Sequence, residues 1–329
     1  MSERNTKHVL HRPSGRARLG FALTLVTVAL WSMIPIGLRI LLEGMDPMTI
    51  TWFRFSAAAL VVGTYLFLQG RLPRLASLDR HHWILLGVAT LALAGNYGFY
   101  VLGLSRTNAS TAQVVIQIAP MLLTVGSIVV FKERFAAVQW LGLCALVAGL
   151  VLFSSDQISH MAAGVDRYAL GLVFMVAAAV TWATYGLAQK QLLGRLPSPA
   201  IMFCIYVGAS VLFTPLARPL TVFDLEPAQL GALLFCIVNM VVAYGTFSEA
   251  LAHWEATRVS ALLATVPLAT LVSLRIAEWL LPELVAPEPI SITGFVGALF
   301  VVAGSAMAAL GSASRRSASV EAVVEEESS

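Results

Sequence analysis

The chain has 329 residues, of which 58% are hydrophobic and only 12% are charged, with a mean hydropathy of +0.81 and a formal net charge of +3. Soluble globular domains are about half apolar and about one quarter charged, so this composition excludes an ordinary soluble domain. Apolar stretches of about 20 residues, enough to cross a hydrocarbon core ~30 Å thick, alternate with short charged segments. The sequence predicts an all-α integral membrane protein.

The N-terminal segment, residues 1–19, is basic and is expected to be a cytoplasmic tail. The apolar run that follows it, Leu19–Leu42, is too long for the apolar region of a signal peptide and has no small-residue cleavage site after it. It therefore predicts a retained first span. Three cysteines fall in apolar runs without metal-site or disulfide spacing, and we expect them to be reduced and buried: Cys144, Cys204 and Cys236.

Ten membrane spans are predicted along the chain, five in each half. In order they cover about 20–41, 49–69, 83–104, 107–130, 137–154, 168–190, 199–217, 228–251, 257–280 and 290–311. The first half is thus 20–153 and the second 168–311, with a non-cytoplasmic linker at 154–167. Residues 312–329 are Ser-rich and end in an acidic run, which predicts a disordered cytoplasmic tail.

The basic residues predict the orientation of the spans. Fifteen Lys and Arg residues fall on the side that holds both termini, four fall on the other side, and two lie within spans. Cytoplasmic loops carry the excess of Lys and Arg, so both termini are predicted to be cytoplasmic. The four on the non-cytoplasmic side are Arg39, Arg106, Arg167 and Arg218.

The two halves repeat the same landmarks in the same order. At an offset of 147, Tyr97-Gly98 pairs with Tyr244-Gly245, and Pro120 pairs with Pro267. "GLCALVAG" (142–149) pairs with "GALFVVAG" (297–304) at an offset of 155. Because each half has an odd number of spans, the second half must enter the membrane from the opposite side. This predicts an inverted-topology repeat, the architecture that many secondary transporters use for alternating access.

Several segments resemble the EamA-type transporters of the drug/metabolite transporter superfamily. They are "WFRFSAAAL" (52–60), "YVLGLSRTNASTAQVVIQIAPMLLTVGSIVVFKERF" (100–135), "GLCALVAGLVLF" (142–153) and "EALAHWEATRVSALLATVPLATLVSLRIAEWL" (249–280). The small-residue start, central proline and final Glu of the fourth span carry the resemblance, which covers nearly the whole chain as two tandem units. In the second unit the interval from Pro267 to Glu278 is eleven residues, against thirteen from Pro120 to Glu133, so that acidic position does not carry across.

The resemblance implies ten helices around a central cavity, formed mainly by spans 1–4 and 6–9, with spans 5 and 10 at the periphery. It implies a transporter of the bacterial inner membrane without a cofactor or metal, commonly an exporter of amino acids, other metabolites or toxic compounds. The expected partners are a small-molecule substrate and the lipid bilayer, with no nucleic acid.

Two ionisable residues are candidates for function because charges within spans are costly. Arg54 lies in the second span, where its guanidinium either reaches the interface, pairs structurally or anchors a substrate carboxylate or phosphate. Glu249, at the cytoplasmic end of the eighth span, is either a solvated interfacial carboxylate or a proton-coupling group. Arg275 and Glu278 are spaced i,i+3 and are expected to pair with each other.

Uncharged polar and aromatic residues within the spans form a second set of candidates. Individually, such residues are expected to make helix–helix hydrogen bonds, and as a set they predict the lining of a substrate cavity. The set is Trp31, Asn96, Tyr97, Tyr100, Gln113, Gln117, Trp182, Tyr244 and Ser248. The second half has Ser260 and Ala264 in place of the two glutamines, so the lining is predicted to differ between the halves.

Prolines and glycines at repeated positions have predicted architectural roles. Pro120 and Pro267 each remove a backbone donor and are expected to kink or hinge their spans. Gly142 and Gly149, like Gly297 and Gly304, are seven residues apart and so share a helix face. These small faces predict either tight packing within the monomer or a homodimer contact.

The predicted function is a secondary transporter that exports a small metabolite by alternating access. The alternatives are a membrane-embedded enzyme and a channel-like protein. The sequence has no H-E-x-x-H metal motif, no P-loop and no G-x-S-x-G nucleophile motif, which argues against an enzyme and against a nucleotide-driven pump.

Overall fold

In the computed structural model the described residues are 16–73, 78–119, 121–122, 137–159, 165–253, 259 and 262–307. Every regular element within them is helical, which confirms the predicted all-α class. They are α1 (Ala17–Leu41), α2 (Pro47–Leu68), α3 (Arg80–Leu104), α4 (Ala109–Val115), α6 (Ala137–Ser159), α7 (Val165–Leu192), α8 (Ser198–Phe213), the 3-10 helix η2 (Pro219–Asp224), α9 (Pro227–His253), α11 (Val266–Leu280) and a last helix, Ile292–Met307. Within the described ranges, six helices are long and apolar enough to span a membrane, and α8 and Ile292–Met307 are shorter apolar helices.

Several helices begin at residues that the sequence makes natural N-caps. The Asp46 carboxylate accepts hydrogen bonds from the backbone N–H groups of Met48 and Thr49, with Pro47 as the first residue of α2. Asp79 caps α3 in the same way, and the hydrogen bond from the His82 backbone N–H lowers the pKa of Asp79.

Helices α6 and α7 extend into the predicted linker at 154–167, since α6 continues to Ser159 and α7 begins at Val165. Two other predictions change in the structure. The fourth span is not continuous, since α4 ends at Val115 and a turn at 116–117 follows. Of the three free cysteines only Cys236 is buried. Of the predicted tails, residues 1–15 of the N-terminal one (1–19) and all of the C-terminal one (312–329) lie outside the described residues.

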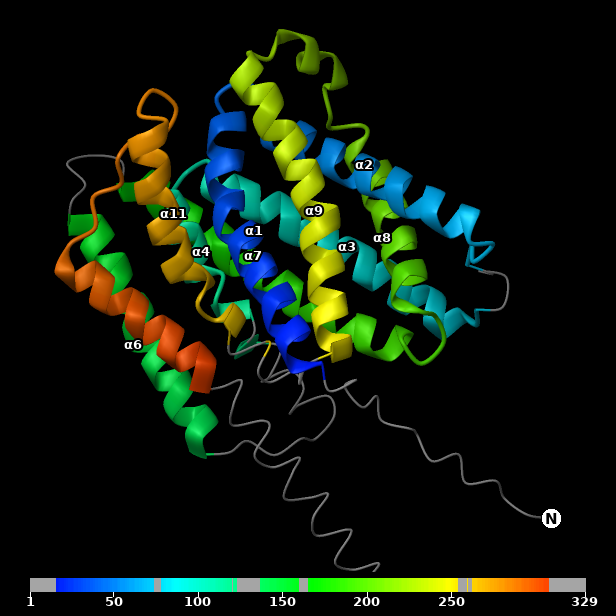
Figure 1. The fold of residues 1–329 in the computed structure, drawn as a ribbon, viewed down its shortest axis with the longest axis horizontal. Coiled ribbons are helices and arrows are strands. Elements are labelled where there is room, and N and C mark those ends of the chain that lie inside the picture. The colour runs from blue at the N-terminus through cyan, green and yellow to red at the C-terminus, as the bar shows by residue number, and fades with distance from the viewer. Residues whose placement is uncertain are drawn as a thin grey trace, which may run out of the picture.

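The two halves of the chain interleave instead of forming separate bundles (Figure 1). Helix α1 packs along α9, α3 packs along α7, and α2 packs against α8. The first helix of each half therefore lies on the third helix of the other half. Hydroxyl pairs also join the halves, Thr27 to Thr246 between α1 and α9 at 2.9 Å, Ser56 to Ser210 between α2 and α8 at 2.6 Å, and Ser32 to Ser273 between α1 and α11 at 3.2 Å.

The predicted glycine faces join α6 to the last helix, Ile292–Met307, along one edge of the bundle (Figure 1). A Cβ added at Gly149 would lie 2.6 Å from the carbonyl oxygen of Gly297, and one at Gly304 would overlap the carbonyl oxygen of Gly142. The first glycine of one helix thus faces the second glycine of the other, so the two helices run antiparallel. The glycines allow this close approach within one chain, and a homodimer stays a prediction.

Candidate functional site

Several predicted site residues meet between α1, α3 and α9. The Tyr97 hydroxyl donates to the Tyr244 hydroxyl across 3.4 Å. Trp31 packs edge-on against Tyr244 with ring centroids 5.7 Å apart, and its ring lies 5.6 Å from that of Phe247. We call this contact surface between the two halves, from Trp31 through Tyr244 to Tyr97, the seam.

Arg54 lies at the edge of the seam, on α2. Its side chain is only 5% exposed, so it does not reach a membrane interface, and its guanidinium lies over the Tyr97 ring at 4.8 Å. Within the described residues Arg54 forms no ion pair, and its Nε has no hydrogen-bond partner. Placing a charged arginine inside a membrane costs about 3 kcal/mol on insertion scales, whereas a desolvated cation–π contact returns about 2 kcal/mol. The charge is therefore only partly compensated.

Gln113 is explained by a proline on the neighbouring helix. Pro35 lies inside α1 and has no N–H, which leaves the carbonyl of Trp31, four residues earlier, without its helical donor. The side-chain amide of Gln113 donates to that carbonyl at 2.7 Å. The preceding carbonyl of α1, that of Leu30, accepts from the side-chain amide of Asn239 on α9 at 2.6 Å. Gln113 and Asn239 thus hold an irregular stretch of α1 in place.

Gln117 connects two interrupted helices. It lies in the turn at 116–117 that follows α4, and its amide donates to the carbonyl of Ala264 at 3.2 Å. Ala264 lies in a second turn, at 264–265, directly before α11. The turn at 116–117 ends three residues before Pro120, and the turn at 264–265 ends two residues before Pro267. Pro267 is near the start of α11, while Pro120 lies outside the described residues.

The remaining predicted residues lie near the seam or at its ends. Asn96 donates to the Ala178 carbonyl of α7 at 2.8 Å, a helix–helix hydrogen bond. The buried Tyr100 hydroxyl has no hydrogen-bond partner among the described atoms. Trp182 packs on the apolar cluster that contains Tyr97. Ser248 belongs to α9, but its side chain lies outside the described part of the structure.

Glu249 lies in the last turns of α9 and is well exposed. Its side chain is 61% exposed and its Oε1 is 2.9 Å from Nε2 of His253, one turn further along. This is the geometry of an interfacial carboxylate, and proton coupling through it stays a prediction. The expected pair on α11 is confirmed, because the Arg275 guanidinium donates to Glu278 at 2.6 Å.

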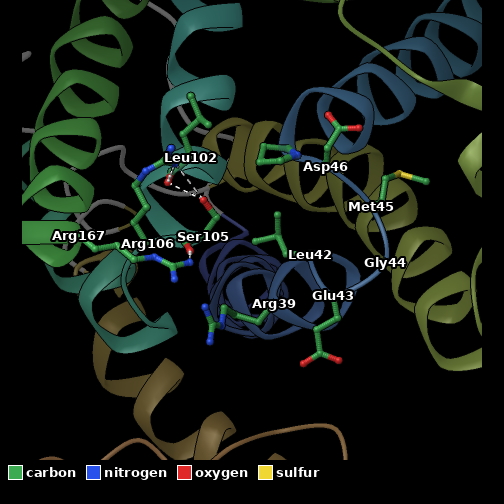
Figure 2. Close-up of a pocket in the computed structure, with 11 residues that line it drawn as sticks. Arg39, Leu42, Glu43, Gly44, Met45, Asp46, Leu102, Ser105, Arg106 and Arg167 are labelled. Atoms are coloured by element: carbon green, nitrogen blue, oxygen red, sulfur yellow. Dashed lines mark hydrogen bonds between the residues drawn. The ribbon is translucent and has the colours of Figure 1, made fainter. Parts of the chain in front are cut away.

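The structure also contains an open pocket that the sequence did not predict (Figure 2). Its volume is about 810 Å³, and it lies where the turn between α1 and α2 meets the end of α3 and the start of α7. None of the candidate cavity residues lines it. Its charged lining residues are Arg39, Glu43, Asp46, Arg106 and Arg167.

Three arginines of this pocket hold the carboxyl end of α3. Arg39 donates to the carbonyls of Leu104 and Thr107, at 3.4 and 3.2 Å. Arg106 donates to the carbonyl of Leu102 at 2.9 Å, and Arg167 donates to that of Ser105, also at 2.9 Å. Cations are favourable at a helix C-terminus, where carbonyls lack helical donors. Three of the four arginines predicted on the non-cytoplasmic side therefore gather at one place.

A second unpredicted feature is a buried carboxylate at the start of α4. Glu288 accepts hydrogen bonds from the backbone N–H groups of Ala109 and Ser110, at 2.8 and 3.0 Å. Its own backbone is held by the paired Arg275 and Glu278 of α11. Glu288 and its targets are nearly 180 positions apart, so no local sequence signal pointed to this contact.

Comparison with known proteins agrees with this architecture. Residues 18–155 and 169–310 both match the model of the EamA-like transporter family. The chain belongs to this family. It carries two EamA units, and the paired landmarks of the sequence fall within them.

Relatives that this EamA chain matches over most of their length are named as transporters or as an efflux pump. It is 36% identical over 297 residues to the inner membrane transporter YhbE of Escherichia coli strain K12, covering 90% of this chain and 92% of that protein. It is 33% identical over 294 residues to a transporter of Haemophilus influenzae, covering 89% and 95% of the two chains. At 24% identity over 316 residues it resembles a probable amino-acid metabolite efflux pump of Salmonella typhimurium, covering 91% and 97%.

The fold is also found among solved structures. One crystal structure matches with a TM-score of 0.61 over 91% of this chain and 98% of that chain, at 20% sequence identity. At that identity the likeness concerns the fold alone. The family and the relatives identify a membrane transporter related to inner membrane proteins, without naming its substrate.

Proposed function

We propose that this EamA protein is a secondary transporter that exports a small metabolite across the bacterial inner membrane by alternating access. Its ten helices would form two five-helix repeats of inverted topology, with the substrate bound at the seam. The observation that carries the proposal is the meeting of two interrupted helices, since Gln117 of one turn donates to Ala264 of the other. Secondary transporters commonly build their sites from discontinuous helices at the interface of inverted repeats.

Contacts between repeated positions support the two-fold relation of the halves. Gln117 and Ala264 are 147 positions apart, and so are Tyr97 and Tyr244. When two halves are related by a two-fold axis, a residue touches its own counterpart only beside that axis. Two such contacts at the same offset are what a common axis through the seam requires.

The glycine pairs obey the same relation at an offset of 155. Gly142 corresponds to Gly297, and Gly149 corresponds to Gly304. The two-fold operation therefore converts the observed contact of Gly142 with Gly304 into that of Gly297 with Gly149, which is also observed. This agreement supports an axis that also passes between α6 and the last helix.

The direction and cellular setting of transport rest on the relatives and on the loop charges. The Salmonella typhimurium relative is named as an efflux pump for amino-acid metabolites, which supports export of a small amphipathic solute. The fifteen-to-four bias of basic residues supports cytoplasmic termini. In this orientation the arginine-lined pocket of Figure 2 opens on the non-cytoplasmic side.

The site residues would have two different roles. Trp31, Tyr97, Tyr100, Trp182 and Tyr244 would present aromatic surface to the solute when the seam opens. Asn96, Gln113 and Gln117 donate to backbone carbonyls, so they would hold the irregular backbone of the site and set its shape. Side-chain hydrogen bonds of this kind act as glue between helices in lipid.

Transport by the purified protein in proteoliposomes tests the proposal. With a panel of labelled metabolites, the vesicles should show saturable uptake of at least one solute. Unlabelled solute inside the vesicles should accelerate the entry of the labelled solute. Non-saturating flux without this acceleration would indicate a channel. Chemical conversion of the solute without vectorial movement would indicate an enzyme, and either outcome would overturn the proposal.

A pH gradient across the same vesicles tests proton coupling through Glu249. We expect Glu249→Gln to leave solute binding intact, because the carboxylate is exposed and bonded to His253, away from the seam. If Glu249 couples transport to protons, the variant loses the stimulation by the gradient. Unchanged stimulation in the variant would remove Glu249 from that role.

A further inference from the structure

We infer that the transported solute is an organic anion whose carboxylate binds Arg54 and Tyr100 within the seam and passes the arginine-lined pocket at the non-cytoplasmic end. This inference rests on the proposed transport function and specifies the substrate class of the same site. Two separate features of the described structure support it, one buried and one at the surface.

The buried feature is a pair of polar groups without partners. Arg54 is 5% exposed, its Nε has no hydrogen-bond acceptor, and no described carboxylate forms an ion pair with it. Tyr100 lies one turn after Tyr97 on α3, whose ring Arg54 contacts, and the Tyr100 hydroxyl is also buried without a partner among the described atoms. Buried polar groups in native proteins are normally hydrogen-bonded, so unpaired ones call for an explanation. A carboxylate offers two acceptor oxygens, which suit a planar guanidinium and a hydroxyl donor.

The cation–π contact with Tyr97 does not by itself compensate the buried charge of Arg54. The Tyr97 ring contacts the face of the guanidinium at 4.8 Å, which leaves the N–H groups in the guanidinium plane to be satisfied. Arg275 shows the contrast within the same fold, because it donates to both Glu278 and the backbone of Glu288. A structural arginine in this protein therefore has acceptors, whereas Arg54 lacks a charged partner within the described residues.

The surface feature is the pocket with three guanidinium groups. Arg39, Arg106 and Arg167 gather beside Ser105, while Asp46 and Glu43 lie toward the other side (Figure 2). The hydrogen bonds to the end of α3 engage Nη1 of Arg39, Nη1 of Arg106 and Nη2 of Arg167, so each guanidinium has further N–H groups. The Asp46 carboxylate is already used as the cap of α2. An anion entering this pocket therefore meets a positive wall.

The two features lie along the same helices. Pro47 lines the pocket at the start of α2, and Arg54 follows seven residues later, about 10 Å further along the helix axis. On α3, Leu102 lines the pocket two residues after Tyr100. An anion leaving Arg54 toward the non-cytoplasmic side would therefore move along α2 and α3 toward the three arginines.

The decisive test compares carboxylates with their amides on the full-length protein. In detergent, benzoate, phenylacetate and succinate should raise the melting temperature, and benzamide, phenylacetamide and succinamide at equal concentration should not. Arg54→Gln should abolish the stabilisation by carboxylates, and Arg54→Lys should weaken their binding at least ~10-fold, because lysine lacks the planar fork. Arg218→Gln is the control, since Arg218 is a non-cytoplasmic arginine that does not line the pocket.

The outer pocket is tested by transport in proteoliposomes. Arg106→Gln should raise several-fold the carboxylate concentration needed on the non-cytoplasmic side for half-maximal uptake, and should leave the stabilisation of the detergent-solubilised protein by carboxylates in place. Amides or amines that bind as tightly as carboxylates would overturn the inference. If Arg54→Gln fails to fold, the comparison of carboxylates with amides on the wild-type chain and on Arg54→Lys decides whether the carboxylate binds Arg54.

These outcomes separate the substrate class from the transport function. Saturable exchange of neutral or cationic solutes, accelerated by unlabelled solute inside and absent for carboxylates, would refute the anionic substrate class. It would leave the proposed transport function in place. Binding of carboxylates that depends on Arg54, without vectorial movement across the membrane, would support the anion site. It would refute the proposed transport function.

Discussion

The hydroxyls of Tyr97 and Tyr244 are 3.4 Å apart, although the two residues are separated by 147 positions and occupy equivalent places in the two EamA units. The ring of Trp31 rests against this pair. A contact between equivalent residues joins the two halves at their common boundary. Motion of one half against the other would therefore have to change this contact.

Gln113 is predicted to stabilise the fold through the carbonyl that Pro35 leaves free. Gln113→Leu should lower the free energy of unfolding by about 1–2 kcal/mol, because the Trp31 carbonyl loses its donor. In a Pro35→Ala background the residue at 35 can supply the missing helical N–H, so the same change should cost distinctly less. Unfolding by denaturing detergent, followed by circular dichroism, measures the four proteins. Equal destabilisation by Gln113→Leu in both backgrounds would contradict the role of Gln113 as donor to the carbonyl that Pro35 leaves free.

Gly149 is predicted to tolerate no side chain. Gly149→Ala places a Cβ 2.6 Å from the Gly297 carbonyl oxygen and should destabilise the protein by about 1–3 kcal/mol. Gly231→Ala is the matched control, since a Cβ on that glycine of α9 meets nothing within 4 Å and alanine favours a helix. Melting temperatures in detergent compare the two. Equal stability of the two variants would show that α6 and the last helix do not pack as described.

Glu288 is predicted to fix the start of α4. Glu288→Gln should destabilise the protein by about 1–2 kcal/mol, because a charged acceptor of the Ala109 and Ser110 N–H groups becomes neutral. Glu283→Gln, on an exposed residue of the same loop, should have little effect. Hydrogen exchange of the Ala109 and Ser110 amides should increase in the first variant alone. Unchanged protection of these amides would exclude the capping role.

Two exposed leucines test the orientation that the loop charges predict. Leu220, in η2, should lie on the non-cytoplasmic side, and Leu193, just after α7, should lie on the cytoplasmic side. In a chain without its native cysteines, Leu220→Cys should react with a membrane-impermeant maleimide in intact cells. Leu193→Cys should react only after the cells are opened. The reverse pattern would invert the topology.

The helices followed from the sequence because length and hydropathy are local properties, and the N-caps at Asp46 and Asp79 are local as well. The prolines also predicted that the fourth and ninth spans would be irregular. The turns themselves lie just before the prolines, because a proline disturbs the carbonyls of the preceding helical turn.

The site was harder to predict because its contacts are distant in the chain. Gln113 was selected as a polar residue in an apolar run, but its partner depends on Pro35, which lies on another helix. Asn239 gives the same local signal, an amide in an apolar run, but is not among the predicted site residues. The arginine-lined pocket depends on residues 39, 106 and 167 meeting at the end of α3, which only the packing of three helices brings about.

Locking the two halves together tests the central claim, alternating access at the seam, most directly. The side-chain oxygens of Thr27 and Thr246 are 2.9 Å apart on α1 and α9, so Thr27→Cys and Thr246→Cys in a chain without native cysteines should form a disulfide on oxidation. We predict that oxidation stops saturable uptake in proteoliposomes, that reduction restores it, and that either single variant is unaffected. Full uptake by the completely cross-linked protein would contradict the account.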